Sequence, residues 1–227
     1  MPSTRTIIWT KPADVAARTA QLGFPLEVLT RTIDVWIAGM NSGTPFHAEN
    51  YAGTIAYHES LATLRLEGKL VGLEKLSRDG VQLCLCPGTK VAVVIAQGDA
   101  RTGDLENLHL KPSTKYKKGS GSRALLATQP YLPGFQVETE SASAEEPYDV
   151  WLLLLRMTGG GDTVAELSWP SEIHVKRNSK GEERCTIVDW HERILLGSFP
   201  NDPQGQKALP SDLAPTSEVE VSVKKRA

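Results

Sequence analysis

Two acidic residues follow the most apolar stretch of the chain and could bind a divalent cation. Asp99 and Asp104 lie in the segment GDARTGD at 98–104, just after the apolar run VAVVIA at 91–96. Such a run is typical of a strand buried on both faces, so the two carboxylates lie where a strand emerges into solvent. Carboxylate oxygens are good ligands for Mg²⁺ and Ca²⁺. Asp and Gly are also the ordinary residues of turns, and that interpretation stays open.

A basic, glycine-containing segment follows at 111–123 and could bind phosphate or nucleic acid. Backbone N–H groups at glycines can hold a phosphate when positive charge surrounds them, and an aromatic ring can stack on a base. The phosphate-binding pattern G-x-x-x-x-G-K-[ST] is absent, so a solvated loop is the alternative. The candidate binding residues are Lys111, Lys115, Tyr116, Lys117, Lys118 and Arg123.

A histidine flanked by acids is the third candidate. His191 lies in the segment VDWHER, with Asp189 and Glu192 within two residues of it. A carboxylate beside an imidazole can orient it as a general base. The segment GSGS at 119–122 does not match the nucleophile pattern G-x-S-x-G, so no nucleophile is assigned. The catalytic candidates are therefore Asp99, Asp104 and His191, and they form no coherent catalytic set.

The cysteines allow a zinc hypothesis. Cys84 and Cys86 share one face of a predicted strand, and with Cys185 and His191 they would supply four zinc ligands. No C-x-x-C pair supports this site, and packed free thiols are the alternative. The chain has three cysteines, an odd number that favours a reducing cytosol over a disulfide framework.

The bulk composition limits the class of protein. The chain has 227 residues, of which 40% are hydrophobic, enough for a sizeable core. Its formal net charge is -2, so a global attraction to nucleic acid or to an anionic membrane is not expected. No apolar run reaches the roughly 18 residues of a membrane-spanning helix, and the N-terminus lacks the features of a signal peptide. We therefore expect a cytoplasmic protein with no membrane partner.

Helices are predicted in the first third of the chain, at 12–22, 25–40 and about 48–67. Thr10 is the expected N-cap of the first helix, and Gly23 is expected to end it. In the third helix, the helical spacing of the apolar residues predicts one buried stripe that includes His58 as a core histidine. The residues of this stripe are Tyr51, Ile55, His58, Ala62 and Leu66.

The first two helices also allow a DNA-binding interpretation. Residues 12–40 form a helix–glycine–helix pair with the general character of a DNA-reading unit. The turn falls about two residues late for the usual spacing. The second helix also begins with Phe24, Pro25 and Leu26, where a recognition helix needs polar side chains. A DNA-binding regulator acting through 12–40 remains an alternative.

Strands are predicted from the change to a two-residue period. They cover 81–86 and 91–96, paired as a hairpin, then 150–157, 164–169, 173–176, 184–190 and 194–196, with Pro170 ending a strand or marking an edge. This order predicts an α+β fold, with N-terminal helices followed by a mainly antiparallel sheet, irregular loops and an extended C-terminal tail. We expect one domain at 1–197, with its helical part at about 10–68 and its sheet at about 71–197. A mobile acidic segment is expected at 136–149, and a proline-containing tail at 198–227.

Four segments resemble a known group of proteins: TIIWTKPA at 6–13, TPFHAENYAGTIAYHE at 44–59, VAVVIAQGDARTGD at 91–104 and TKYKKG at 114–119. In this order they are similar to small accessory proteins of bacterial conjugative plasmids and related mobile elements, some of the fertility-inhibition type. The resemblance covers most of 5–197 and assigns no residue a role. It implies a non-enzymatic protein that inhibits DNA transfer by binding a component of the transfer machinery, such as the coupling ATPase of type IV secretion.

A second hypothesis treats the loop at 98–123 as the functional part of the chain. It describes a metal-dependent nucleotide- or nucleic-acid-binding protein, either a nuclease or a phosphohydrolase. Asp99 and Asp104 would hold the metal, and the lysines would hold phosphate. The leading hypothesis needs no cofactor, whereas this one needs a divalent metal.

Overall fold

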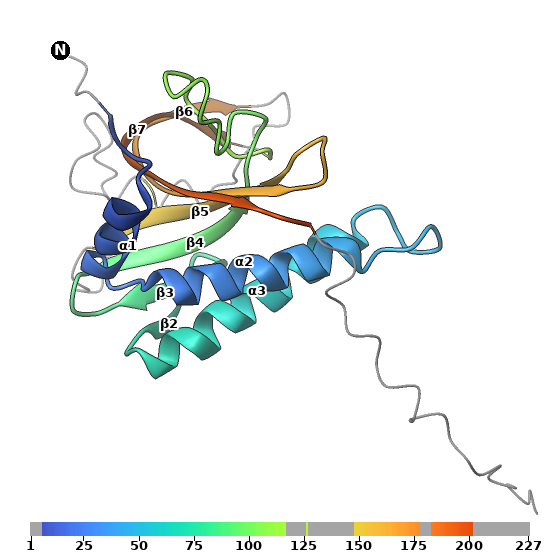
Figure 1. Cartoon of the computed structure of the whole chain (residues 1–227), viewed down its shortest axis with the longest axis horizontal. Coiled ribbons are helices and arrows are strands. Elements are labelled where there is room, and N and C mark those ends of the chain that lie inside the picture. Colours follow the sequence, from blue (N-terminus) through green and yellow to red (C-terminus); the bar gives the residue numbers. More distant parts are fainter. Residues whose placement is uncertain (1–5, 117–125, 127–147, 178–182, 202–227) are drawn as a thin grey trace, which may run out of the picture.

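A computed structural model describes residues 6–116, 126, 148–177 and 183–201 (Figure 1). Several predictions lie outside the described residues. These are the basic residues Lys117, Lys118 and Arg123, most of the acidic segment, and the C-terminal tail beyond Asn201.

Seven strands form one mixed sheet in the order β1-β7-β6-β5-β4-β3-β2. Neighbouring strands run antiparallel except for the pairs β1–β7 and β4–β5, which are parallel. The expected α+β class is confirmed, and so is the expected hairpin, which joins β3 and β4. The strands are β1 (Ile7–Trp9), β2 (Glu74–Arg78), β3 (Val81–Cys86), β4 (Val91–Gln97), β5 (Asp149–Met157), β6 (Thr163–Arg177) and β7 (Glu183–Phe199).

Three helices precede most of the sheet: α1 (Pro12–Gln21), α2 (Leu26–Asn41) and α3 (Tyr51–Leu70). α2 and α3 form a long hairpin against one face of the sheet, and α1 lies near β7 (Figure 1). Apolar residues of the helices meet alternate residues of the strands in a buried core. This core includes Leu29, Ile33, Leu64, Val93, Trp151, Leu153 and Ile194.

The boundary between α1 and α2 follows the sequence signals closely. Gly23 has φ +82°, a left-handed conformation that glycine adopts at little cost after a helix end. Pro25 precedes α2 directly, where its missing N–H is no disadvantage. The expected N-cap of α1 was wrong, because Lys11 occupies that position and caps with no side-chain hydrogen bond.

The face of the sheet opposite the helices is covered by two of the sheet's own strands. β6 and β7 are long and curl over this face, beneath the loop at 98–116 (Figure 1). Their register shifts between Trp169 and Pro170 and again on either side of Glu172, and such irregularities bend strands. A second core fills the enclosed space, including Val94, Leu152, Leu154, Ile173, Ile187 and Trp190. Pro170 does not end a strand, because the irregular register accommodates it within β6. The alternative that it marks an edge agrees with the pairing, because β5 pairs with β6 only as far as Ser168 and Pro170 pairs with β7 alone.

The predicted buried stripe of α3 was also wrong. His58, Ala62 and Leu66 are exposed, whereas the face that packs inward carries Ala56, Ser60, Leu61, Leu64 and Gly68. Small residues on this inward face let α2 approach closely. A Cβ added at Gly39 of α2 would lie 2.7 Å from the backbone N of Ala56. α3 therefore buries Leu61 and Leu64 together with small residues against the rest of the fold, and leaves the predicted row in solvent.

Candidate functional site

His191 lies at an irregular position in the sheet. Trp169 of β6 is opposite Glu192 of β7, but the next residue, Pro170, is opposite Trp190. His191 is therefore the extra residue of a β-bulge, a feature that redirects side chains and is common beside functional sites. Its imidazole centroid lies 4.6 Å from that of the Trp169 ring, which in turn stacks at 5.9 Å on Trp151.

The two acids predicted to orient His191 are largely engaged elsewhere. Asp189 accepts a 2.6 Å ion-pair contact from Lys111. Glu192 lies on the helical side, where it accepts hydrogen bonds from the Trp9 indole N–H at 2.6 Å and from Arg18 at 2.6 and 2.8 Å. His191 therefore stays a prediction as a catalytic residue, and Glu192 is held on the other side of the sheet by Trp9 and Arg18.

Asp149 is the carboxylate that acts most strongly on the charge of His191. Burial lowers the pKa of His191, while the carboxylates of Asp149 and, more weakly, Asp189 oppose that shift. Burial raises the pKa of Asp149, opposed by His191. Asp149 was expected to belong to the mobile acidic segment. That expectation was wrong, because its N–H donates to the Lys90 carbonyl at 2.8 Å as β5 begins.

His191 and Asp149 act on each other electrostatically, and no nucleophile is assigned beside them. Burial favours the neutral form of the His191 imidazole, and a neutral imidazole can accept a proton. Perturbed groups of this kind occur at functional sites and also in ordinary structural clusters. His191 and Asp149 are thus a place for general acid–base chemistry or for a pH-dependent contact.

The two acids of the loop at 98–104 accept local hydrogen bonds. The Asp99 carboxylate accepts the N–H of Arg101 at 3.0 Å. Asp104 accepts the N–H groups of Glu106 and Asn107, each at 3.0 Å, and the Asn107 amide at 3.1 Å. Hydrogen bonds from Asn107 are the main cause that lowers the pKa of Asp104. Within the described ranges, no three His, Cys, Asp or Glu side chains are grouped as metal ligands.

A buried ion pair that the sequence analysis missed holds this loop to the sheet. Arg193 of β7 and Glu166 of β6 are both fully buried, and Nη2 of the arginine lies 2.7 Å from Oε2 of the glutamate. Glu166 also accepts the N–H of Gly103 at 3.1 Å, and Arg193 donates to the Leu108 and Leu110 carbonyls at 3.3 and 3.2 Å. The available signal was Glu166 between the apolar residues of β6; Arg193 follows other polar residues of β7 and carried no comparable signal.

The structure brings the beginning of the acidic loop beside the first residues of the basic segment. Gly98 pairs with Thr114 in an isolated β-bridge, and the Asp99 N–H donates to the Ser113 carbonyl at 2.9 Å. Lys111 is bound to Asp189, and the Lys115 ammonium lies 5.5 Å from the centroid of the Tyr116 ring. Phosphate binding by this loop stays a prediction.

The proposed zinc ligands are not brought together among the described residues. Cys84 is buried beneath α3, where its Sγ lies 3.8 Å from the Leu64 carbonyl oxygen. Burial raises the pKa of the Cys84 thiol to about 11. Cys185 is buried in the curled part of β7, paired in register with Val175. The three cysteines form no disulfide, and the packed-thiol interpretation fits these positions.

The turn between α2 and α3 presents a large aromatic side chain to solvent. Phe46 is 98% exposed at this turn, which extends beyond the end of the sheet (Figure 1). The turn is ordered by its neighbours. The Thr44 N–H donates to Nδ1 of His47 at 3.0 Å, and the His47 ring stacks on Tyr51 with centroids 3.8 Å apart.

Comparisons of this chain with protein-family models, with curated proteins and with solved structures found no match. In the part of the chain that the structure describes, no helix is both long and apolar enough to cross a membrane.

Proposed function

We propose that this chain is a non-enzymatic, cytoplasmic accessory protein of a mobile element, which inhibits conjugative DNA transfer by binding a protein of the transfer machinery. Phe46 at the end of the helical hairpin is the observation that carries this proposal. It lies within the segment 44–59, one of the four that resemble fertility-inhibition proteins. Binding through an exposed aromatic anchor is consistent with the action implied by that resemblance.

An exposed phenylalanine on an ordered turn is suited to anchoring a protein partner. Aromatic side chains bury about 150–250 Å² each and dominate the energetics of many interfaces. The residues around Phe46 are mainly polar, including Ser42, Thr44 and Asn50, and could supply the polar rim of an interface. The stacked His47 and Tyr51 already order the turn, so binding would lose less conformational entropy.

The base of the hairpin turn is also held in place. The side-chain amides of Asn41, at the end of α2, and Asn201, after β7, hydrogen-bond to each other in both directions. This contact joins the hairpin to the end of the sheet. A partner that binds Phe46 would therefore contact a rigid arm.

The proposal is tested by expressing the chain in donor cells that carry a conjugative plasmid. We expect expression to lower the transfer frequency, and affinity purification to recover a component of the transfer machinery. Phe46→Ala should weaken partner binding by about thirtyfold, corresponding to about 2 kcal/mol for loss of a central anchor, and should relieve the inhibition. The control Leu105→Ala removes another exposed apolar side chain, on the loop at 98–116, and should leave both effects unchanged.

Unchanged transfer frequency on expression, together with recovery of no transfer component, would overturn the proposal. Equal loss of inhibition in the Phe46→Ala and Leu105→Ala variants would remove the hairpin turn as the binding surface.

A further inference from the structure

The outward face of α3 carries apolar side chains in contact with solvent. Leu66 is 68% exposed and Leu70 is 79% exposed, and Ala62 is exposed one turn earlier. Together with the exposed His58 they occupy every fourth position, so they form one continuous row along the helix. A row of this kind is suited to packing against another helix.

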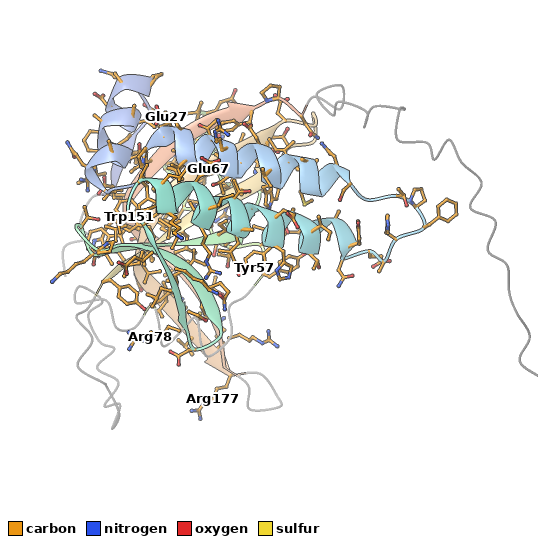
Figure 2. The ribbon with its side chains drawn as sticks, turned by 90° about the horizontal axis from the view of Figure 1, so that it is seen from below. Glu27, Tyr57, Glu67, Arg78, Trp151 and Arg177 are labelled. Carbon is orange, nitrogen blue, oxygen red and sulfur yellow. The ribbon has the colours of Figure 1, made fainter. Side chains whose placement is uncertain are left out.

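The neighbouring helix does not share this character. α2 and α3 lie side by side across the sheet, with Glu27 on α2 and Glu67 on α3 marking the two helices in Figure 2. The exposed side of α2 carries Glu27, Arg31 and Asp34. The apolar row is therefore specific to α3 and not a general property of the helical layer.

We propose that this row is the contact surface between two copies of the chain, paired antiparallel through α3. A two-fold axis that crosses the helix pair at the height of Leu64 brings residues equidistant from Leu64 to the same height. Ala62 and Leu66 lie two residues before and after Leu64, so a small side chain of one copy meets a large one of the other. His58 and Leu70, six residues before and after it, meet in the same way.

Charge selects the direction of the pairing. Glu59 and Lys69 are both exposed and lie five residues before and after Leu64. In the antiparallel arrangement, the acid of each copy lies at the same height as the base of the other, at both ends of the interface. In a parallel arrangement, Glu59 would lie beside its own counterpart and Lys69 beside its own, which is repulsive.

The size of this surface indicates a weak, reversible dimer. The row at 58–70 spans about 18 Å of the helix, so the contact buries an area below the roughly 1,200 Å² of standard interfaces, in the range of weak and transient ones. We therefore expect a dissociation constant on the order of 10 μM.

Sedimentation velocity on the purified full chain tests this directly, between about 1 and about 200 μM, which brackets that constant. The expected result is a reversible monomer–dimer equilibrium. Leu66→Lys should weaken it at least roughly tenfold, because a charge would be buried at the centre of the contact. Glu59→Lys alone and Lys69→Glu alone should each weaken it several-fold, and the double variant Glu59→Lys/Lys69→Glu should restore it. Glu27→Lys on α2 is the matched control and should change nothing.

A chain that stays monomeric at about 200 μM would overturn the proposal, since a 10 μM dimer would then predominate. A double charge reversal that dimerises no better than either single reversal would overturn the antiparallel arrangement. Circular dichroism would confirm that each variant is folded. The measurement uses this chain alone, so its outcome is independent of any partner bound through Phe46.

Discussion

Arg193 and Glu166 form a buried ion pair in which Nη2 and Oε2 lie 2.7 Å apart, directly beneath the loop that carries Asp99 and Asp104. Both side chains are fully buried between β6, β7 and this loop. The remaining hydrogen-bonding groups of the pair go to the loop backbone and to Ser168. The pair therefore helps to hold the loop on the sheet, together with the hydrogen bonds from Arg156 to the Thr102 carbonyl and from the Trp190 indole to the Pro112 carbonyl.

Glu166→Gln should destabilise the fold strongly, because it leaves the Arg193 guanidinium buried without an opposite charge. We expect the free energy of unfolding to fall by about 3–5 kcal/mol, measured by urea denaturation. Adding Arg193→Met to this variant should recover part of the loss. The control Glu67→Gln removes the carboxylate of the more exposed Arg31–Glu67 pair and should cost less than about 1 kcal/mol. Equal losses for the buried and exposed pairs would contradict the structural role of Glu166.

Two glycines in the helical hairpin should respond oppositely to substitution by alanine. Gly39→Ala places a methyl group against the backbone of Ala56 and should destabilise the fold by about 1–3 kcal/mol. Gly53→Ala adds a methyl group in α3 with no atom within 4 Å and should stabilise it by about 0.5–1 kcal/mol. Thermal unfolding of the two variants measures whether each substitution lowers or raises the stability of the fold. A harmless Gly39→Ala would show that α2 and α3 do not pack this closely.

His191 should make the fold sensitive to mild acid. Burial lowers its pKa in the folded state, so the unfolded chain binds more protons as the pH falls through its ordinary value of about 6.5. The free energy of unfolding should therefore fall from pH 7.5 to pH 5.5, two values that bracket the ordinary histidine pKa of about 6.5. His191→Gln should show a smaller fall, whereas His109→Gln, which removes an exposed histidine, should behave like the unchanged chain.

Asp149 should change the free energy of unfolding in the opposite direction as the pH rises. Its raised pKa means that stability is lost as the pH rises from its ordinary value of about 3.8. Because His191 also acts on the pKa of Asp149, comparing the two histidine variants at the same two pH values measures the contribution of His191 together with its effect on Asp149. Identical pH dependence in both variants would contradict the buried setting of this imidazole.

The three thiols should differ in reactivity. Burial raises the pKa of Cys84 to about 11, so at pH 8 only about one molecule in a thousand carries the reactive thiolate. Cys185 is also buried, whereas Cys86 is half-buried. A disulfide reagent should modify Cys86 quickly in the folded chain, and Cys84 and Cys185 only after unfolding. Cys86→Ala should therefore abolish the fast reaction. Simultaneous reaction of all three thiols in the folded chain would contradict these burial assignments.

Local signals in the sequence predicted the helical hairpin and the central strands. Pro12, Gly23 and Pro25 mark the ends of α1 and the beginning of α2, and the apolar run at 91–96 is β4. The inward face of α3 could not be predicted from hydrophobicity. Its close packing against Gly39 depends on small residues such as Ala56, whereas Leu66, which the apolar spacing placed in the core, faces solvent.

The candidate site was only partly predictable, because strand pairing in the sheet brings together residues that are far apart in the sequence. His191 stood out beside acids, but its position in a bulge depends on the register of β6. Asp149 is distant in sequence and resembled the end of an acidic segment. The pairing of Glu166 with Arg193 likewise arises only once β6 and β7 lie side by side. A charged residue within a strand, such as Glu166, indicates a buried polar position but does not identify its partner.

The most direct test of the proposed function is photo-crosslinking from position 46 inside donor cells. Phe46→p-benzoyl-L-phenylalanine keeps an aromatic side chain at the exposed end of the helical hairpin, and the same replacement at Leu105 serves as the control. We predict an adduct with a protein of the conjugative transfer machinery from position 46 and none from position 105. Absence of such an adduct from position 46, in cells whose transfer is measurably inhibited, would contradict binding through this hairpin.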